Sequence, residues 1–310
     1  MIAKTAVDKT SFLKKIQLTN SAREGWELIL RTLDSKAKVL LPSYIGVTDR
    51  EGSGIYDPVT TVGLEHDFYL LNEDLSISIE LLEQTLKTGD YKLILLVHYF
   101  GFRIQNIDKI TKLCKKYNVI TVEDCAHLYN YNLYNYSDAG THGDFTFYSL
   151  HKYFPFENGG MYVQNNSAVQ APDSSTIKLS SELSSELMKY DIAAIANKRR
   201  TNFETLDKMM QGIVGVRPLK KMGEGDIPHN YPIVVENGLR EKLYFWLIEK
   251  DLTLIALYYR LINPLQTEEY KSMQFLSSSI LNLPIHQDIT KKDIQFIVDL
   301  LKEGLIALKK

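Results

Sequence analysis

Two apolar runs separated by an amphipathic segment most constrain how this chain can fold. Residues 92–98 read KLILLVH, an almost continuous apolar run that is typical of a strand buried on both faces. Apolar residues then recur at intervals of three and four from Ile104 to Tyr117, which predicts a helix. Residues 119–122, VITV, predict a second buried strand. A strand, a helix and a strand of these lengths form a βαβ unit, so we expect the two strands to be parallel.

Polar side chains follow both of these predicted strands. His98 ends the first strand, and Glu123, Asp124 and His127 follow the second. Because ligands of open parallel sheets bind beyond the carboxyl ends of the strands, these residues are candidates for a site. A buried acid at that edge requires a cationic partner. From the residues alone, Asp124 is equally consistent with a helix cap or a turn, and both histidines with satisfied core residues.

A lysine in the segment GDFTFYSLHKYFPFENGG, residues 143–160, is a candidate nucleophile. Alternation of Phe145, Phe147 and Ser149 with Thr146 and Tyr148 predicts a short strand with one buried face. Asn158–Gly160 predict a turn before a new strand at Met161–Val163. We therefore expect Lys152 at the end of a strand, in a tight connection. Loss of hydration there favours the neutral amine, which can condense with a carbonyl group. The alternative is an ordinary surface lysine in a turn.

The composition excludes several classes of function. The 310 residues carry a net charge of −2, so no basic field attracts nucleic acid or an anionic membrane surface. No apolar run reaches the roughly 20 residues that span a bilayer, and the amino terminus lacks the apolar core of a signal peptide. The two cysteines, Cys114 and Cys125, predict neither a disulfide framework nor a metal cluster. We expect a cytoplasmic protein without a metal site.

The remaining patterns divide the chain into two domains. A serine-rich stretch without periodicity, residues 164–185, separates the strands described above from a helical region that ends near Met210. We expect a large domain over residues 1–200 and a small α+β domain over residues 201–310. Further elements are predicted as helices at 22–33, 77–87, 238–249 and 291–308, the last capped by Thr290 with Asp293, and as strands at 38–41, 231–235 and 253–256.

Lys152 and Asp124 together fit the chemistry of pyridoxal phosphate. The lysine would hold the cofactor aldehyde as a Schiff base, and the acid would keep the pyridine nitrogen protonated, so that the ring withdraws electrons. The cofactor phosphate requires hydroxyl and backbone N–H groups, which Ser149 and a helix start at Ser21–Arg23 can supply. An ordinary capped surface helix is the alternative for that helix start.

Six segments in this order resemble the DegT-type sugar aminotransferases, which are fold-type-I pyridoxal-phosphate enzymes. The segments are NSAREGWELIL, VLLPSY, LLVHYFG, ITVEDCAH, GDFTFYSLHKYFPFENGGM and LNLPIHQDIT. All but the last lie within residues 20–163. The resemblance implies an α/β fold, in which a three-layer large domain with a mixed, mostly parallel sheet is joined to the small α+β domain. It also implies a homodimer with active sites at a two-fold interface.

The resemblance implies a role for each matching residue. Lys152 would be the Schiff-base lysine and the proton shuttle, and Asp124 would pair with the pyridinium nitrogen. Tyr44 would lie against the cofactor ring, His127 near its 3-hydroxyl group, and His98 on the substrate side. The residues that would surround the phosphate are Ser149, Ser21, Ala22 and Arg23.

The implied function is an aminotransferase that acts on a keto-sugar nucleotide in cell-surface polysaccharide biosynthesis, with glutamate as amino donor. Two features depart from the family. Ala22 stands where this branch commonly has glycine, and residues 164–185 do not match the segment that reaches the partner subunit's site. Two alternatives therefore stay open. One is a pyridoxal-phosphate-dependent lyase or dehydratase. In a related class of these enzymes histidine replaces the lysine, and His151 stands next to Lys152 in the sequence. The other is a non-catalytic paralogue that binds the cofactor.

Overall fold

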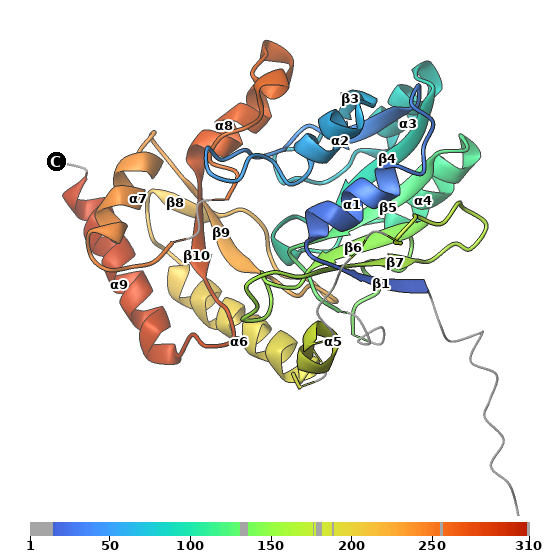
Figure 1. Cartoon of the computed structure of the whole chain (residues 1–310). Helices are drawn as coiled ribbons and strands as arrows, with labels where there is room; N and C mark the ends of the chain where they lie inside the picture. Colours follow the sequence, from blue (N-terminus) through green and yellow to red (C-terminus); the bar gives the residue numbers. More distant parts are fainter. Residues whose placement is uncertain are drawn as a thin grey trace, which may run out of the picture.

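The computed structural model describes residues 15–130, 136–175, 177, 182–187, 189–254 and 257–308. The strands of its larger sheet are β1 (Lys15–Thr19), β2 (Lys38–Pro42), β3 (Glu65–Tyr69), β4 (Tyr91–Val97), β5 (Ile120–Cys125), β6 (Phe145–Ser149) and β7 (Gly160–Gln164). They lie in the order β1-β7-β6-β5-β4-β2-β3. The smaller sheet has the order β10-β9-β8, from strands β8 (Val216–Pro218), β9 (Asn230–Val235) and β10 (Ile280–Pro284). Figure 1 shows the larger sheet, in blue to green, beside the smaller one, in yellow to red.

The predicted βαβ unit is confirmed. Helix α4 (Ile107–Lys116) connects β4 to β5, and the two strands pair in parallel from Leu93 opposite Ile120 to Val97 opposite Asp124. Every residue of β4 except Lys92 is buried, as the apolar run predicted. Among the described strands of the larger sheet, β7 alone runs in the opposite direction to the rest, and it pairs antiparallel with β1 and β6. The other neighbouring strands pair in parallel. The sheet is therefore mixed and mostly parallel, and the expected α/β fold is confirmed.

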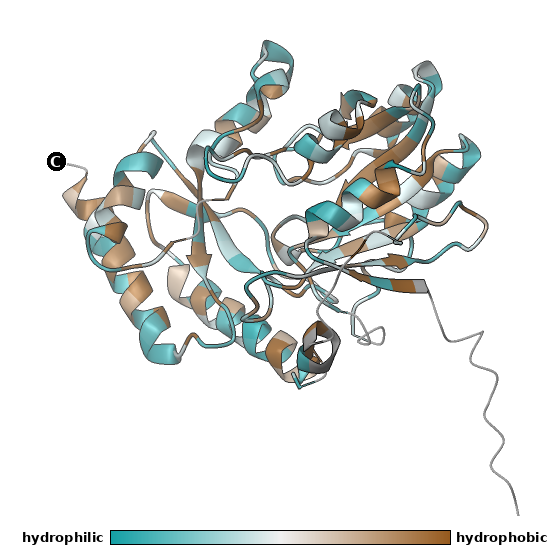
Figure 2. Ribbon diagram, in the orientation of Figure 1, coloured by the Kyte–Doolittle hydropathy of each residue, from teal (hydrophilic) through white to brown (hydrophobic). Residues whose placement is uncertain are grey.

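Helices flank the larger sheet. Helix α1 (Ala22–Leu30) packs over β6 and β7, where the Trp26 ring stacks on Phe147 with 5.7 Å between centroids. Helix α2 (Tyr56–Val62) packs against α1, while α3 (Ile79–Thr88) and α4 contact each other beside β3 and β5. Figure 2 shows brown, hydrophobic central strands under helices with teal outer faces. Burial of these apolar faces against the sheet stabilises the layered arrangement.

Antiparallel strands and four helices form the carboxyl-terminal part. The helices are α6 (Ile192–Met210), α7 (Arg240–Ile248), α8 (Lys271–Ser279) and α9 (Lys291–Ala307). The predicted capping box of α9 is confirmed, since Thr290 and Asp293 each bond the other's backbone N–H. Helix α6 joins the two parts, because Ala196 packs in the cluster beneath β6 and β7 whereas the Phe203 ring packs at a tilt against Tyr231 of β9. The predicted boundary after residue 200 lies within this helix.

Several elements differ from the sequence-based predictions. Strands β1 and β3 and helix α2 were not predicted, because they are short and β3 carries Glu65, His66 and Asp67 on a partly exposed surface. The helical region near residues 184–210 is two helices, α5 (Glu182–Leu187) and α6, and Asp191 caps the second. The predicted strand at 253–256 is wrong for residues 253 and 254, which have no regular structure; residues 255 and 256 lie outside the described chain.

The described residues contain neither a membrane-spanning helix nor a cluster of metal ligands. No helix there combines the length and the apolar character that a bilayer crossing requires. No group of three or more His, Cys, Asp or Glu side chains in the same residues is arranged to hold a metal ion. Cys114 and Cys125 are buried free thiols.

Candidate active site

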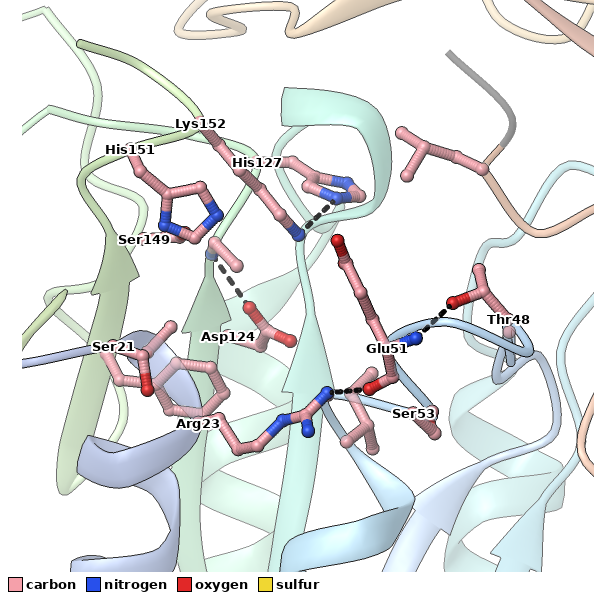
Figure 3. Close-up of a pocket in the computed structure, with 18 of the residues that line it drawn as sticks. Ser21, Arg23, Thr48, Glu51, Ser53, Asp124, His127, Ser149, His151 and Lys152 are labelled. Atoms are coloured by element: carbon pink, nitrogen blue, oxygen red, sulfur yellow. Dashed lines mark hydrogen bonds between the residues drawn. The ribbon is translucent and has the colours of Figure 1, made fainter. Parts of the chain in front are cut away.

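A cavity of about 560 Å³ lies beyond the carboxyl ends of β4, β5 and β6 (Figure 3). This volume is within the range of small-molecule sites. The start of α1, the loop of residues 46–55, the turn after β6 and Tyr258 from the carboxyl-terminal part complete its lining. All predicted site residues except Tyr44 contribute to that lining, namely Ser21, Ala22, Arg23, His98, Asp124, His127, Ser149 and Lys152.

The register of the sheet positions Asp124. This residue pairs with Val97 on one side and Phe147 on the other, so it lies between the ends of two neighbouring strands. The side chain is buried, and its Oδ1 accepts a hydrogen bond from the Ala126 N–H at 2.7 Å. Among the described residues, Oδ2 has no hydrogen-bond partner. Burial raises the pKa of the Asp124 carboxyl group, although the Ala126 N–H and the charge of Lys152 oppose this shift.

Lys152 reaches the cavity from the turn after β6. Its side chain is half-buried, and Nζ lies 3.2 Å from Nε2 of His127. Figure 3 shows Lys152 and Asp124 both pointing into the cavity. Burial lowers the pKa of the Lys152 amine, and the carboxylates of Asp124 and Glu51 only partly counter this effect. The position at a strand end matches the prediction, and a lowered pKa is what a nucleophilic amine requires.

Close backbone contacts hold this turn against the start of α1. The Gly159 N–H donates to the carbonyl of Asn20 at 2.8 Å. A Cβ atom on Gly160 would lie 2.2 Å from the carbonyl carbon of Ser21 and 2.4 Å from the nitrogen of Ala22. Only glycine fits there, so the predicted glycine turn has a specific role. It lets the segment that carries Lys152 approach the helix start.

The start of α1 offers free hydrogen-bond donors to the cavity. Ser21 is the N-cap, and its side chain accepts from the Glu24 N–H at 3.1 Å. The N–H groups of Ala22 and Arg23 precede the first intrahelical bonds, so the helix leaves them without acceptors. The Arg23 guanidinium donates to the Glu51 carbonyl at 2.6 Å. Free N–H groups and the positive end of the helix dipole suit a phosphate.

Ser149 and His151 flank Lys152. The Ser149 Oγ lies 3.2 Å from Nδ1 of His151, and both residues line the cavity. Burial lowers the pKa of the His151 ring, and the neighbouring charge of Lys152 acts in the same direction. His151 is nevertheless largely exposed, whereas Lys152 reaches inward toward His127.

His98 lines the cavity, but both of its ring nitrogens bond within the protein rather than facing a substrate. Its Nε2 bonds a Glu123 carboxylate oxygen at 2.8 Å, and its Nδ1 accepts from the Ile104 N–H at 3.2 Å. Both ring nitrogens are therefore occupied within the protein, and none is left for a substrate. Glu123 also accepts backbone N–H groups from Gly140 and Gly143. His98 is thus the satisfied buried histidine that the sequence left open as an alternative.

Tyr44 also differs from its prediction. The side chain is fully buried, and its ring stacks on that of Tyr258 with 5.0 Å between centroids. Tyr258, not Tyr44, lines the cavity. Sequence reasoning missed Tyr258 because it lies about 100 residues beyond Lys152, in a left-handed backbone conformation (φ +57°) that its residue type does not indicate. The loop from Glu51 to Gly54 also lines the cavity, and nothing in its composition marks it as part of a site.

Comparison with known proteins finds a family match over part of the chain. Residues 55–175, which include Asp124 and Lys152, match the model of the DegT/DnrJ/EryC1/StrS aminotransferase family. The GDP-perosamine synthase of Escherichia coli O157:H7 is 29% identical over 166 residues, which cover 53% of this chain. The match spans 40% of the length of that curated relative.

Solved sugar aminotransferases share the fold. The aminotransferase TlmJ from Streptoalloteichus hindustanus has a TM-score of 0.75 at 18% identity, with 96% of this chain and 87% of that chain covered. Helicobacter pylori PseC, an aminotransferase of pseudoaminic acid biosynthesis, has a TM-score of 0.75 at 17% identity, with 96% and 88% covered. The PLP form of the putative sugar aminotransferase Spr1654 from Streptococcus pneumoniae has a TM-score of 0.75 at 18% identity, with 93% and 86% covered. The chain thus matches the DegT/DnrJ/EryC1/StrS aminotransferase family in sequence over residues 55–175 and shares the fold of these solved aminotransferases over nearly all of its length.

Proposed function

We propose that this chain is a pyridoxal-phosphate-dependent aminotransferase that acts on a keto-sugar nucleotide and takes its amino group from glutamate. The observation that carries the proposal is that the amine of Lys152 and the buried carboxylate of Asp124 face one cavity. The family match supports the reaction class. The names of the curated relative, a GDP-perosamine synthase, and of PseC, an aminotransferase of pseudoaminic acid biosynthesis, support a sugar substrate. The proposed role in cell-surface polysaccharide biosynthesis rests on the resemblance in sequence.

The cavity fits pyridoxal phosphate in two independent ways. Asp124 keeps one carboxylate oxygen without a hydrogen-bond partner among the described residues, and burial of the side chain raises the pKa of its carboxyl group. A protonated pyridine nitrogen would supply the missing cation. The start of α1 separately offers the N–H groups of Ala22 and Arg23, near the hydroxyl of Ser149, to a phosphate. Without a ligand, the carboxylate oxygen of Asp124 and the N–H groups at the start of α1 lack partners in the described part of the protein, which costs stability.

When bound, the cofactor supplies an electron sink for the carbon that loses its proton. The chain supplies the proton chemistry. Lys152 Nζ, with its lowered pKa, can accept a proton from the amino donor's α-carbon and return one to the sugar carbon. Asp124 holds a positive charge at the ring nitrogen. Tyr258 and the ring of His127 lie edge to face with 5.9 Å between centroids and line the same cavity.

Glutamate without any sugar provides the test. Glutamate alone should convert the cofactor-loaded protein to its pyridoxamine-phosphate form, with loss of the visible absorption band. Lys152→Ala should show no such conversion. A lyase need not respond to glutamate, and a non-catalytic paralogue would respond to neither glutamate nor a keto-sugar nucleotide. The inward position of Lys152 compared with exposed His151 favours the aminotransferase.

The proposal includes a homodimer in the cytoplasm, on the basis of the resemblance in sequence to a family whose sites lie at a two-fold interface. Light scattering of the full chain should give twice the mass of one 35.6 kDa chain. A monomer at micromolar concentration would contradict this part of the proposal and leave the chemistry of Lys152 open to its own test.

A further inference from the structure

A buried column of two histidines and an arginine stands behind Lys152. The His127 ring stacks on His229 with 5.1 Å between centroids and 9° between planes. The Arg199 Nη1 lies 3.4 Å from Nδ1 of His229. The exposed fractions are 4% for His127, 8% for His229 and 2% for Arg199. Of these three side chains only His127 borders the cavity, so the column is not a second ligand site.

A backbone N–H determines which nitrogen of His127 carries the proton. The Phe100 N–H points at Nδ1 of His127 at 3.3 Å. A backbone N–H can only donate, so Nδ1 must be the unprotonated, accepting nitrogen. The neutral ring then carries its hydrogen on Nε2, which is the nitrogen 3.2 Å from Lys152 Nζ.

This tautomer fixes the protonation state of Lys152. Because Nε2–H donates, Nζ must accept the hydrogen bond. An ammonium group has three donors and no lone pair, so only a neutral amine can accept. The geometry of Phe100, His127 and Lys152 is therefore consistent with one arrangement, in which the lysine is a free base before any ligand binds.

The same argument applies to His229, whose Nδ1 faces Arg199. The guanidinium is always charged and can only donate, so Nδ1 of His229 also accepts and its ring is neutral. Arg199 lies 4.3 Å over the Tyr153 ring and donates to Gln287. Among the described residues no carboxylate lies within ion-pair distance of Arg199. Its charge is therefore not neutralised by an ion pair, although Asp288 acts on it at longer range, and it opposes a second positive charge on the adjacent ring.

We propose that the Phe100 N–H and Arg199 hold His127 and His229 as neutral rings, and that His127, donating through Nε2, keeps Lys152 as a free amine. His127 and Arg199 are then positioning residues for Lys152. The purpose of this device rests on the proposed function, but the protonation states belong to the chain itself and can be measured without turnover.

Other charged groups face the same residues. Asp124, Glu51 and Arg23 act on Lys152; of these, the two carboxylates favour its protonation. His229 is faced by Arg199, Lys152, His286 and His151. Burial lowers the pKa of both His127 and His229 well below the ordinary histidine value; the charge of Arg199 adds to the effect on His229, and the other neighbours would add to it only where they are protonated. The column therefore favours the neutral amine of Lys152, as burial does. It opposes the effect of the Asp124 and Glu51 carboxylates, which favour the ammonium form.

Nitrogen NMR of the full-length chain, labelled with ¹⁵N only in histidine, tests the tautomers. The seven histidines keep the spectrum simple. The rings of His127 and His229, assigned by substitution, should show the Nε2–H tautomer and should not titrate between pH 5 and 8. An Nδ1–H tautomer of His127, or its titration within this range, would overturn the proposal. This measurement needs no variant to be active.

The reactivity of Lys152 tests the consequence. Competitive acetylation of the cofactor-free chain across pH, read by peptide mass spectrometry, gives its apparent pKa against exposed Lys302 as internal reference. His127→Asn keeps an acceptor for Phe100 but cannot reach Lys152, whereas His127→Gln retains a donor of similar reach. The Asn variant should lower Lys152 labelling by roughly three- to tenfold at pH 7, the effect of one lost hydrogen bond. The Gln variant should recover most of the Lys152 labelling that the Asn variant loses. Equal labelling of wild type and the Asn variant would contradict the proposal.

Arg199 has its own matched pair. Arg199→Met removes the charge and should raise the pKa of His229, so that protonation of its ring begins at a higher pH than in the wild type. Arg199→Lys keeps the charge and should leave the titration of His229 unchanged. Thermal melts control for unfolding, and the wild-type spectrum decides the tautomers even where a variant fails to fold. If the titration of His229 is the same in a folded Met variant as in the wild type, Arg199 has no such role. None of these readouts uses glutamate, so failure of the column and failure of the aminotransferase proposal are distinguishable.

Discussion

Gly160 passes so close to Ser21 that a Cβ atom on residue 160 would lie 2.2 Å from the Ser21 carbonyl carbon. The contact joins the strand that follows the Lys152 turn to the start of α1. It therefore sets the distance between the amine and the helix terminus. Two ends of the cavity, separated by about 130 residues in the chain, depend on this one glycine.

Gly160→Ala should weaken both the fold and cofactor binding. The added methyl group meets backbone atoms, which cannot rotate away, so we expect a loss of about 1–3 kcal/mol in the free energy of unfolding. The affinity for pyridoxal phosphate should fall as well, because α1 is pushed back. Gly223→Ala is the control, since a Cβ there would meet only ordinary contact at 3.4 Å. Equal stability and affinity of the two variants would refute the role of the close approach.

Ser21→Ala separates capping from ligand binding. Loss of the N-cap should cost about 1 kcal/mol of stability. It should also reduce the affinity for pyridoxal phosphate, because the N–H groups at the start of α1 become less ordered. Ser78 caps α3 in the same way, through the Leu81 N–H, and lies outside the cavity lining. Ser78→Ala should lose similar stability without any change in cofactor affinity, as measured by fluorescence titration.

Asp124→Asn should stabilise the cofactor-free protein and reduce its activity. Because burial raises the folded-state pKa of Asp124, the folded protein binds this proton more tightly than the unfolded chain does. The ionised carboxylate thus costs stability above the folded pKa, and the cost disappears as pH falls through that pKa. The Asn variant should melt higher at pH 8, with the difference shrinking toward acid. Turnover should fall on the order of a hundredfold or more, as for other lost electrostatic contacts. A lower melting temperature of the variant at pH 8 would contradict this account.

Glu123→Gln should have the opposite pH dependence. Burial raises the pKa of Glu123, but the hydrogen bond and charge of His98 and the N–H groups of Gly143 and Gly140 outweigh it, so the net pKa is lowered. Its contribution to stability is full above the ordinary glutamate pKa of about 4.3 and is lost as pH falls through the lower folded value. We expect the Gln variant to lose about 3 kcal/mol at pH 7. Urea unfolding at several pH values measures both quantities, and a pH-independent difference would contradict the assignment.

Strong local patterns made the centre of the fold and the main site residues predictable. The buried run at residues 92–98 and the glycine turn at 158–160 each need only neighbouring residues to specify their conformation. Parallel pairing then places Asp124 between strand ends, from where a lysine after β6 shares its cavity. These relationships follow from strand geometry alone.

The remainder depends on contacts that no local pattern encodes. His98 turns to Glu123 because loop donors from Gly140 and Gly143 hold that carboxylate in place. Tyr44 lies behind Tyr258 because a distant segment returns to the cavity in a left-handed conformation. Strand β1 gains its structure only by pairing with β7. Each of these results required the tertiary structure.

Chemical trapping tests the central claim most directly. The full-length protein is loaded with pyridoxal phosphate, reduced with borohydride and digested, and the modified peptide is sequenced by mass spectrometry. We predict that the cofactor is attached to Lys152 alone and that Lys152→Ala traps none. Attachment to another lysine, or no attachment to the folded wild-type protein, would contradict the account.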